Sequence, residues 1–244
     1  LSGGSIKIFG YDIRKDFTKA IRQVGAIVEN PDMYMYLTGY ENLKIAASFY
    51  QIDASRIDEV VRMVGLEGRI HEKVKNYSLG MRQRLGIAAS ILHHPKLLIL
   101  DEPLNGLDPE GIRELKDILL HLAHEDKMAI IVSSHILSEL ESFCNRVCIF
   151  SRGHVLKNAT IEEIKKITEK EVYQLEVSST KLDSILSSYL VIDEAHIELS
   201  STKENIVNIL KALLLNDVLV YEVKRKVLGL EDVFLKVMEA SHDF

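Results

Sequence analysis

The 244-residue sequence predicts an α/β fold followed by a small α+β domain. Residues 97–100 (LLIL) and 129–133 (AIIVS) are short apolar segments of the kind found in strands buried on both faces of a parallel sheet. An apolar pattern with helical spacing separates them. Beyond residue 165 the pattern changes to alternating polar and apolar residues. We therefore expect an α/β domain over residues 1–165 and an accessory domain over residues 166–244.

Composition and charge narrow the classes of function. The chain is 47% hydrophobic and 27% charged, as is usual for a globular protein. Its formal net charge of -6 argues against nucleic acid as the main partner, because phosphate binding needs clustered Lys and Arg. The apolar runs have the length of strands, so we do not expect the chain itself to cross a membrane.

The first domain is predicted element by element. Residues 5–10 (SIKIFG) read as a strand that ends in a turn, and residues 24–28 (VGAIV) as a short buried strand. The best-defined helix lies between the two apolar strands, where Asp108 is a suitable N-cap and Pro109 suits the first helical position. Its apolar residues recur at three- and four-residue steps: Ile112, Leu115, Leu119 and Leu122.

The accessory domain is predicted to have the order βαββαβ, which is typical of a ferredoxin-like split unit. The predicted segments are a strand at 172–177, a helix at 182–189, two strands within 191–199, a helix at 205–215 and a strand at 218–223.

Two adjacent carboxylates follow the strand at residues 97–100. Asp101 and Glu102 then lie at the carboxyl edge of a parallel sheet, where ligands bind in open α/β folds. One carboxylate can hold Mg²⁺ through water while the other polarises an attacking water. By themselves they would suit a polar turn equally well.

The neighbouring motifs decide between these readings. Residues 76–84 (NYSLGMRQR) precede an apolar helix, residues 105–108 (NGLD) follow the carboxylates, and residues 133–135 (SSH) follow the next strand. In this order and spacing they resemble the nucleotide-binding domain of ATP-binding cassette (ABC) transporters, a P-loop NTPase fold. The resemblance implies ATP and Mg²⁺ as cofactors.

The resemblance also assigns roles to residues. Asp101 corresponds to the Walker B carboxylate that associates with Mg²⁺, and Glu102 to the general base for water. Residues 105–108, including Asp108, correspond to the D-loop, which crosses a dimer interface. His135 corresponds to the switch histidine that contacts the γ-phosphate.

The signature motif of the family is LSGGQ, and residues 77–81 (YSLGM) correspond to it. Three of five positions differ, but Ser78 and Gly80 are kept, so Ser78, Leu79, Gly80 and Met81 are expected to contact nucleotide. Ser78 can cap the following helix, whose free N–H groups and positive dipole end favour an anion. Gly80 lets the backbone approach that anion closely. The opening residues 1–5 (LSGGS) also resemble the signature motif, but they lead into a strand and not into a helix. We therefore interpret them as a chance match.

Two features depart from the family pattern. Glu29 stands where the family has a Gln that helps organise Mg²⁺ and water, and a carboxylate can accept but not donate a hydrogen bond. With residues 30–31 (NP) and 37–43 (LTGYENL), Glu29 resembles the bacitracin and lantibiotic exporter branch. No G-x-x-x-x-G-K-[ST] phosphate loop (Walker A) occurs and the first residue is Leu. We therefore expect an N-terminal truncation, and poor ATP binding by the chain as given.

Plainer interpretations remain for single residues. Asp108 and Ser78 can be helix caps alone, and His135 can be a histidine without a special role. The apolar cluster of Met33, Tyr34, Tyr36 and Leu37 can be a local core or a contact with a permease.

The resemblance implies the ATP-binding and ATP-hydrolysing subunit of an ABC transporter that powers export, in the manner of antimicrobial peptide resistance. The partners are then a membrane permease and a second nucleotide-binding subunit, in a homodimer or a mixed pair. The location is cytoplasmic, on the inner face of the cell membrane. Two rivals are a non-catalytic or regulatory cassette and a soluble ABC-type ATPase of DNA repair or translation.

Overall fold

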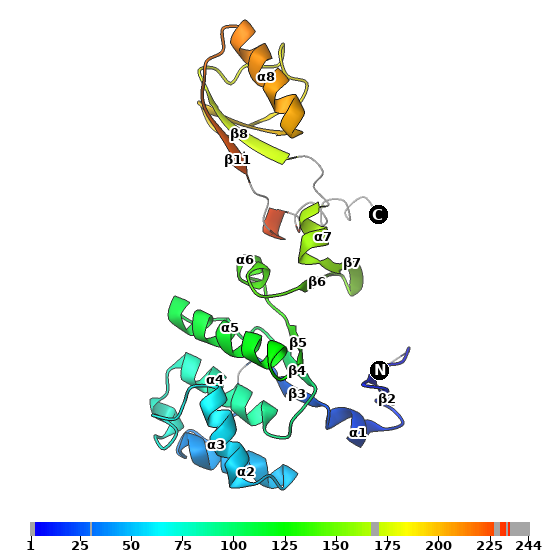
Figure 1. Cartoon of the computed structure of the whole chain (residues 1–244), viewed down its shortest axis with the longest axis vertical. Coiled ribbons are helices and arrows are strands. Elements are labelled where there is room, and N and C mark those ends of the chain that lie inside the picture. The colour runs from blue at the N-terminus through cyan, green and yellow to red at the C-terminus, as the bar shows by residue number, and fades with distance from the viewer. Residues whose placement is uncertain (1–2, 30, 167–170, 227–229, 233, 235–244) are drawn as a thin grey trace. The chain divides into compact units, whose positions relative to one another are not determined.

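The computed structural model describes residues 3–29, 31–166, 171–226, 230–232 and 234 (Figure 1). The chain forms two compact units, Leu1–His135 and Ile136–Phe244. This structural division falls at residue 135, so a hairpin and a short helix before residue 166 belong to the second unit. The functional boundary after residue 165 stays a prediction.

A parallel sheet of three strands forms the centre of the first unit. Its order is β3 (Val24–Ile27), β4 (Leu97–Leu100) and β5 (Ala129–Val132). The register pairs Ile27 with Leu100 and Leu100 with Val132, so all three strands end at one edge. The predicted strand at residues 97–100 is confirmed, and the other two end one residue earlier than predicted.

The other elements of the first unit lie around this sheet. They are β1 (Lys7–Ile8), β2 (Tyr11–Asp12), α1 (Phe17–Ile21), α2 (Gly39–Tyr50), α3 (Ala54–Met63), a 3-10 turn (Val74–Asn76), α4 (Leu79–Ile91) and α5 (Pro109–His124). β1 and β2 pair as an antiparallel hairpin, in agreement with the strand and turn predicted at residues 5–10.

Helix α4 contacts more of the first unit than its modest length suggests. It packs against β3, α2, α3 and α5 (Figure 1). Its inner face buries Leu85, Ile87, Ala88 and Ile91. Gly86 lies so close to Pro31 that a side chain there would meet the proline ring, which brings the helix against the segment after β3. This helix therefore carries residues 78–81 on a firmly packed support.

Helix α5 forms as predicted. Asp108 is its N-cap and accepts a hydrogen bond from the Gly111 N–H at 2.9 Å, and Pro109 occupies the first turn. Leu115, Leu119 and Leu122 are buried, each contributing about 1.5–3 kcal/mol of burial free energy.

The second unit begins with α6 (Leu137–Glu141), the antiparallel hairpin of β6 (Arg146–Ser151) and β7 (His154–Thr160), and α7 (Ile161–Lys166). It continues with β8 (Glu171–Val177), β9 (Leu190–Val191), β10 (His196–Ser201), α8 (Lys203–Leu215) and β11 (Val220–Lys226). The last four strands form an antiparallel sheet in the order β11-β8-β10-β9.

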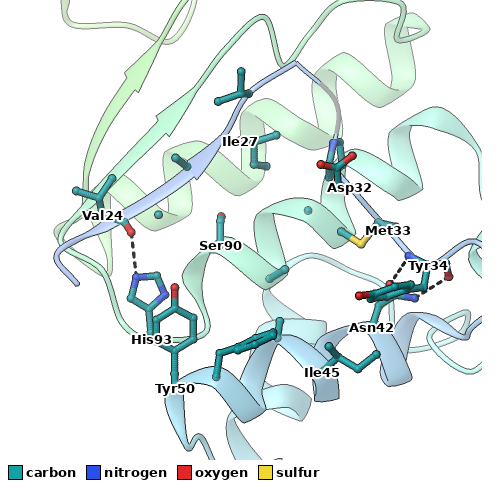
Figure 2. Close-up of a pocket in the computed structure, with 18 residues that line it drawn as sticks. Val24, Ile27, Asp32, Met33, Tyr34, Asn42, Ile45, Tyr50, Ser90 and His93 are labelled. Carbon is teal, nitrogen blue, oxygen red and sulfur yellow. Dashed lines mark hydrogen bonds between the residues drawn. The ribbon is translucent and has the colours of Figure 1, made fainter. Parts of the chain in front are cut away.

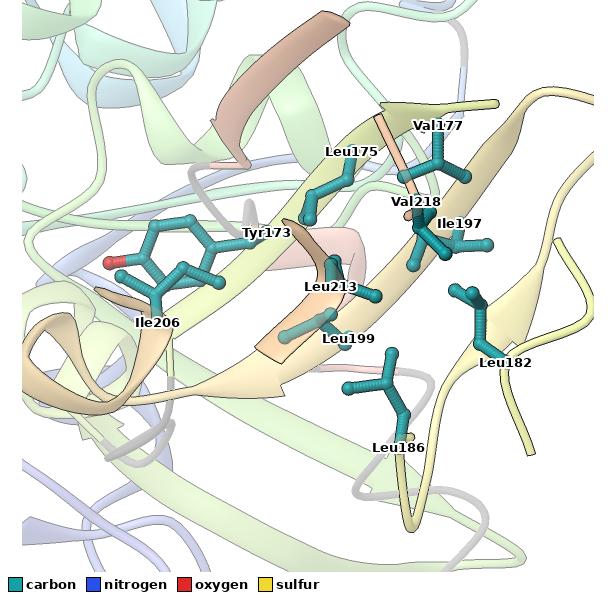
Figure 3. Packing of buried hydrophobic residues seen from close by; sticks show 10 residues of the cluster. All are labelled: Tyr173, Leu175, Val177, Leu182, Leu186, Ile197, Leu199, Ile206, Leu213 and Val218. Carbon is teal, nitrogen blue, oxygen red and sulfur yellow. The ribbon is translucent and has the colours of Figure 1, made fainter. Parts of the chain in front are cut away.

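The core of this sheet comes from alternate residues of β8 and β10, from α8, and from the segment between β8 and β9 (Figure 3). Its buried members are Tyr173, Leu175, Val177, Leu182, Leu186, Ile197, Leu199, Ile206, Leu213 and Val218. The predicted strands and the second helix are present, with shifted ends.

The helix predicted at residues 182–189 is wrong. Only a turn forms there, with the Leu186 N–H donating to the Leu182 carbonyl at 2.8 Å. The Tyr189 hydroxyl accepts from the Leu182 N–H at 2.9 Å and donates to the Thr180 carbonyl at 3.0 Å, which ties the segment into a loop. Leu182 and Leu186 are buried without helical continuation, so their spacing was correct but the element was not.

Replacing Gly86 by Ala tests the packing of α4. A Cβ there would lie 2.6 Å from Pro31 Cβ and 2.8 Å from Pro31 Cγ, closer than van der Waals contact. Overpacking should outweigh the better helix propensity of Ala and lower the free energy of unfolding by about 1–2 kcal/mol, measured by urea denaturation. Gly68→Ala is the control, because nothing lies within 4 Å of its added carbon. Equal stability of the two variants would contradict this packing.

Candidate functional site

The carboxyl edge of the parallel sheet places two acidic side chains beside the end of β5. Asp101 follows β4 directly, and its N–H donates to the Ile27 carbonyl at 3.0 Å, which extends the ladder with β3. Ser133 follows β5, and its N–H donates to the Leu100 carbonyl at 3.0 Å. Asp101 and Glu102 are both half-buried. The sheet register therefore brings residues from 101–102 and 133–135 together.

Hydrogen bonds connect these side chains into one network. The Ser133 hydroxyl donates to Asp101 Oδ1 at 2.6 Å and accepts from the Glu102 N–H at 2.9 Å. His135 Nδ1 lies 2.9 Å from Glu102 Oε2. Because a carboxylate can only accept a hydrogen bond, Nδ1 of His135 must carry the hydrogen and donate it to Glu102. His135 thus fixes one oxygen of Glu102.

Glu102 has a backbone conformation that side chains rarely adopt. Its φ of 46° lies in the left-handed region, where a residue with a Cβ is strained. The Glu102 carbonyl accepts from the Asn105 N–H at 3.1 Å, and its own N–H is bound by Ser133. The turn after β4 is therefore held on both sides of Glu102.

The N-terminus of α4 has the predicted N-cap, while its role as an anion-binding site stays a prediction. Ser78 is the N-cap, and its hydroxyl accepts from the Met81 N–H at 3.2 Å. A Cβ on Gly80 would meet no atom of the described residues nearer than 3.8 Å, so packing against this part of the chain does not require the glycine. Leu79 lies against Gly106, where an added Cβ would be 3.2 Å from Leu79 Cδ2. Residues 78–81 and 105–108 are therefore neighbours.

The position of Glu29 says less about its predicted role in binding Mg²⁺. It is exposed and has a φ of 55°, and its carbonyl lies 3.5 Å from Gln83 Nε2 of α4. Its part in a metal site stays a prediction.

The side chains at the sheet edge have suitable donors for Mg²⁺. The described part of the chain contains no group of three His, Cys, Asp or Glu side chains arranged for a metal ion. Mg²⁺ at phosphate-transfer sites, however, takes one or two carboxylates and fills its other positions with phosphate oxygens and waters. Asp101 and Glu102 supply such hard oxygen donors on adjacent residues, so the donor chemistry fits a magnesium ion that a nucleotide helps to bind.

A groove of about 580 Å³ lies between β3, α2 and α4 (Figure 2). Its walls include Ile27, Met33, Tyr34 and Ile45, together with Phe49, whose side chain is largely exposed. Two members of the predicted apolar cluster, Met33 and Tyr34, therefore line it. Tyr36 is 67% exposed and meets Tyr34 edge to face with ring centroids 6.1 Å apart, so the cluster is not a closed local core.

His93 closes one end of this groove. Its ring stacks on Tyr50 with centroids 4.4 Å apart, and Nε2 donates to the Val24 carbonyl at 3.0 Å (Figure 2). The buried Nδ1 has no hydrogen-bond partner among the described residues. Burial lowers the pKa of the His93 imidazole; the Val24 carbonyl opposes this shift and nearby His94 adds to it. The neutral ring therefore connects α2 to β3.

Sequence reasoning missed two of these side chains. Ser133 binds both acidic residues, although its only signal was its place two residues before His135. Gln83 is 2% exposed and reaches the Glu29 carbonyl, while its Oε1 has no partner among the described residues.

Among the described helices, none has the length and apolar character that crossing a bilayer requires.

Comparisons with known proteins agree with the motifs. The family model described as ABC transporter matches residues 1–105. The ABC transporter ATP-binding protein YhcH of Bacillus subtilis is 44% identical over 240 residues, which cover 97% of this chain and 78% of that protein. The bacitracin transport ATP-binding protein BcrA of Enterococcus faecalis is 36% identical, with 96% and 78% covered. The lantibiotic transport ATP-binding protein SrtF of Streptococcus pyogenes is 43% identical, with 56% and 59% covered.

Solved structures give the same result. An ATP binding subunit of an ABC transporter matches with a TM-score of 0.58 and 31% identity, covering 69% of this chain and 71% of that chain. A Clostridium perfringens chain described as part of the ABC transporter complex cbiONQ matches with a TM-score of 0.62 and 26% identity, with the same coverage.

His93→Gln should change how stability depends on pH. The pKa of His93 is lowered in the folded state, whereas in the unfolded state it has its ordinary value of about 6.5. As the pH falls below about 6.5, the unfolded state therefore binds more protons than the folded state, and the contribution of His93 to the free energy of unfolding decreases. Gln keeps a donor for the Val24 carbonyl but cannot be protonated in this range. The stability gap between wild type and variant, measured by urea denaturation, should narrow from pH 7 to pH 5. A gap that widens would show that His93 favours its charged form.

Proposed function

Because the chain belongs to the family of ABC transporter ATP-binding proteins, with their α/β fold, we propose that it binds and hydrolyses ATP to power export through a separate permease. The observation that carries the hydrolytic part is the network of Asp101, Glu102, Ser133 and His135 at the carboxyl edge of the sheet. Its relatives in bacitracin and lantibiotic transport favour an antimicrobial peptide as cargo. They also favour a transporter over the rival ATPase of DNA repair or translation.

The chemistry is general base catalysis on water. Glu102 takes the proton of the attacking water, and its carboxylate is held for that task by the Nδ1–H of His135 at 2.9 Å. The other ring nitrogen of His135, Nε2, donates to the γ-phosphate in the imidazolium form, in which both ring nitrogens carry a hydrogen. Side-chain exposures of 31% for Glu102 and 65% for His135 leave both within reach of a ligand.

The residues that would hold the nucleotide and its ion lie at the sheet edge and at the start of α4. Asp101 would hold Mg²⁺ together with Glu29, and the ion would supply positive charge that stabilises the phosphates. Ser78, Leu79, Gly80 and Met81 form a phosphate contact for the nucleotide of a second subunit. The surroundings of Gly80 are compatible with this role, because an added Cβ would meet described atoms only at ordinary van der Waals distances of 3.8 Å or more.

The groove between β3, α2 and α4 is the proposed docking place for the permease. The apolar side chains on its walls, such as Ile27, Ile45 and Phe49, suit a helix of the partner, and the groove begins at the residues that lead from β3 to Glu29. The ATPase then works in the cytoplasm on the inner face of the membrane, as one of two paired nucleotide-binding subunits. Asp108 and the rest of residues 105–108 lie at the interface between the two.

Glu102→Gln tests the catalytic role. The amide keeps the shape of the side chain but cannot take a proton, so ATP binding should persist while steady-state hydrolysis falls about 10²–10⁴-fold and a closed dimer accumulates. Phosphate release and size-exclusion chromatography with ATP, both on the full-length subunit, measure these effects.

The control for this experiment is Glu110→Gln, which removes an exposed carboxylate in the first turn of α5. It should hydrolyse ATP at the wild-type rate. If Glu102→Gln does so too, Glu102 is not the base, and the non-catalytic cassette becomes the better description.

Phe49→Glu tests the docking groove. Phe49 lines the groove and is 80% exposed, so the change should spare folding and nucleotide binding but place a charge where an apolar partner packs. The amount of permease recovered with the subunit should fall at least about tenfold, the cost of burying an unpaired charge. Leu215→Glu, at 84% exposure on the second unit, should leave recovery unchanged. Full recovery with Phe49→Glu would remove the groove from the interface.

A further inference from the structure

Ser133 stands where the register of the sheet joins its two acidic neighbours. Leu100 pairs with Val132 across β4 and β5, so the next residue of each strand, Asp101 and Ser133, lie side by side. The Ser133 N–H still donates to the Leu100 carbonyl at 3.0 Å, which keeps the backbone of both strands parallel up to this point. The position of the serine is therefore fixed by the sheet and not by a free loop.

The hydroxyl of Ser133 uses its donor and an acceptor at the same time. It donates to Asp101 Oδ1 at 2.6 Å, a short distance that is typical of a hydroxyl bound to an ionised carboxylate. It accepts from the Glu102 N–H at 2.9 Å. One oxygen atom therefore restrains the side chain of the first acidic residue and the backbone of the second.

These two bonds act on different functions. With Oδ1 bound to Ser133, the Asp101 carboxylate has a fixed rotation and offers its other oxygen to a cation. The Glu102 N–H is bound while that residue has a φ of 46°, so the hydroxyl stabilises the strained turn that presents the second carboxylate to His135.

We propose that Ser133 is a positioning residue of the site, which sets the orientation of Asp101 toward Mg²⁺ and of Glu102 toward water. The inference deepens the proposed function and rests on it. Ser133 itself touches neither reacting atom; it acts through the two carboxylate residues. The contrary view is that the serine only ends β5, in which case any residue of similar shape would serve.

Two substitutions separate these views. Threonine and valine have nearly the same shape, and both suit the end of a strand, but only threonine has a hydroxyl. Ser133→Thr should keep both hydrogen bonds, whereas Ser133→Val should lose both. Ser133→Ala is the second hydroxyl-free variant and replaces Ser133→Val if the larger side chain prevents folding.

The first measurement is the Mg²⁺ concentration that half-saturates ATP hydrolysis by the full-length subunit. A residue that orients a metal ligand typically changes metal affinity or activity by 10–100-fold, so Ser133→Val should need about tenfold more Mg²⁺ or lose about tenfold in kcat. Ser133→Thr should stay close to wild type. Equal values for Ser133→Val and Ser133→Thr would overturn the proposal.

The second measurement needs neither nucleotide nor metal. Hydrogen exchange at the Glu102 amide, resolved by mass spectrometry with fragmentation, should be faster in Ser133→Val and Ser133→Ala than in Ser133→Thr. Exchange that is the same in all three would show that the hydroxyl does not hold this amide, and would also overturn the proposal.

A parallel Glu102→Gln sample distinguishes failure of this inference from failure of the proposed function. If Glu102→Gln hydrolyses ATP normally, the proposed function fails. Hydrogen exchange at the Glu102 amide then still tests whether the Ser133 hydroxyl holds that amide. If Glu102→Gln is inactive while Ser133→Val behaves like Ser133→Thr, the function stands and the positioning role of Ser133 is rejected.

Discussion

The parallel register of β3, β4 and β5 is the constraint on which the site depends. Ile27, Leu100 and Val132 are paired across three strands, so whatever follows them is delivered to one edge. The apolar side chains of the strands carry no chemistry, yet they determine which polar side chains meet. A shift of one residue in the register of β5 would move Ser133 away from Asp101 and would also break the contact between His135 and Glu102.

Helix α4 connects this edge to the rest of the first unit. Its N-terminus presents Ser78 and Gly80 beside residues 105–108, while its middle packs against β3 and the segment that contains Pro31. The same helix is also a wall of the groove. Helix α4 therefore contributes residues both to a wall of the groove and to the candidate phosphate site at its N-terminus.

Local chemistry decided how much the sequence could predict. Asp108 and Ser78 were identifiable as N-caps, since a cap is recognised from a few neighbouring residues, and the strand at 97–100 from its apolar run. The part of Ser133 in the network could not be foreseen, because it requires the register between two strands more than thirty positions apart. The helix expected at 182–189 failed for a related reason: the Tyr189 hydroxyl binds both the Leu182 N–H and the Thr180 carbonyl, and this contact closes the segment into a loop that the spacing of its apolar residues does not reveal.

The two glycines of α4 discussed above illustrate two kinds of constraint on one helix. Gly86 is required by its own chain, since the carbon it lacks would collide with Pro31; Gly80 has room for that carbon. A survey of variants that scores folding alone would register the first and pass over the second. If Gly80 contacts a second subunit as proposed, selection on it becomes visible only when that molecule is present. Tolerance in the isolated chain and intolerance in the assembly would then together mark the surface where the assembly forms.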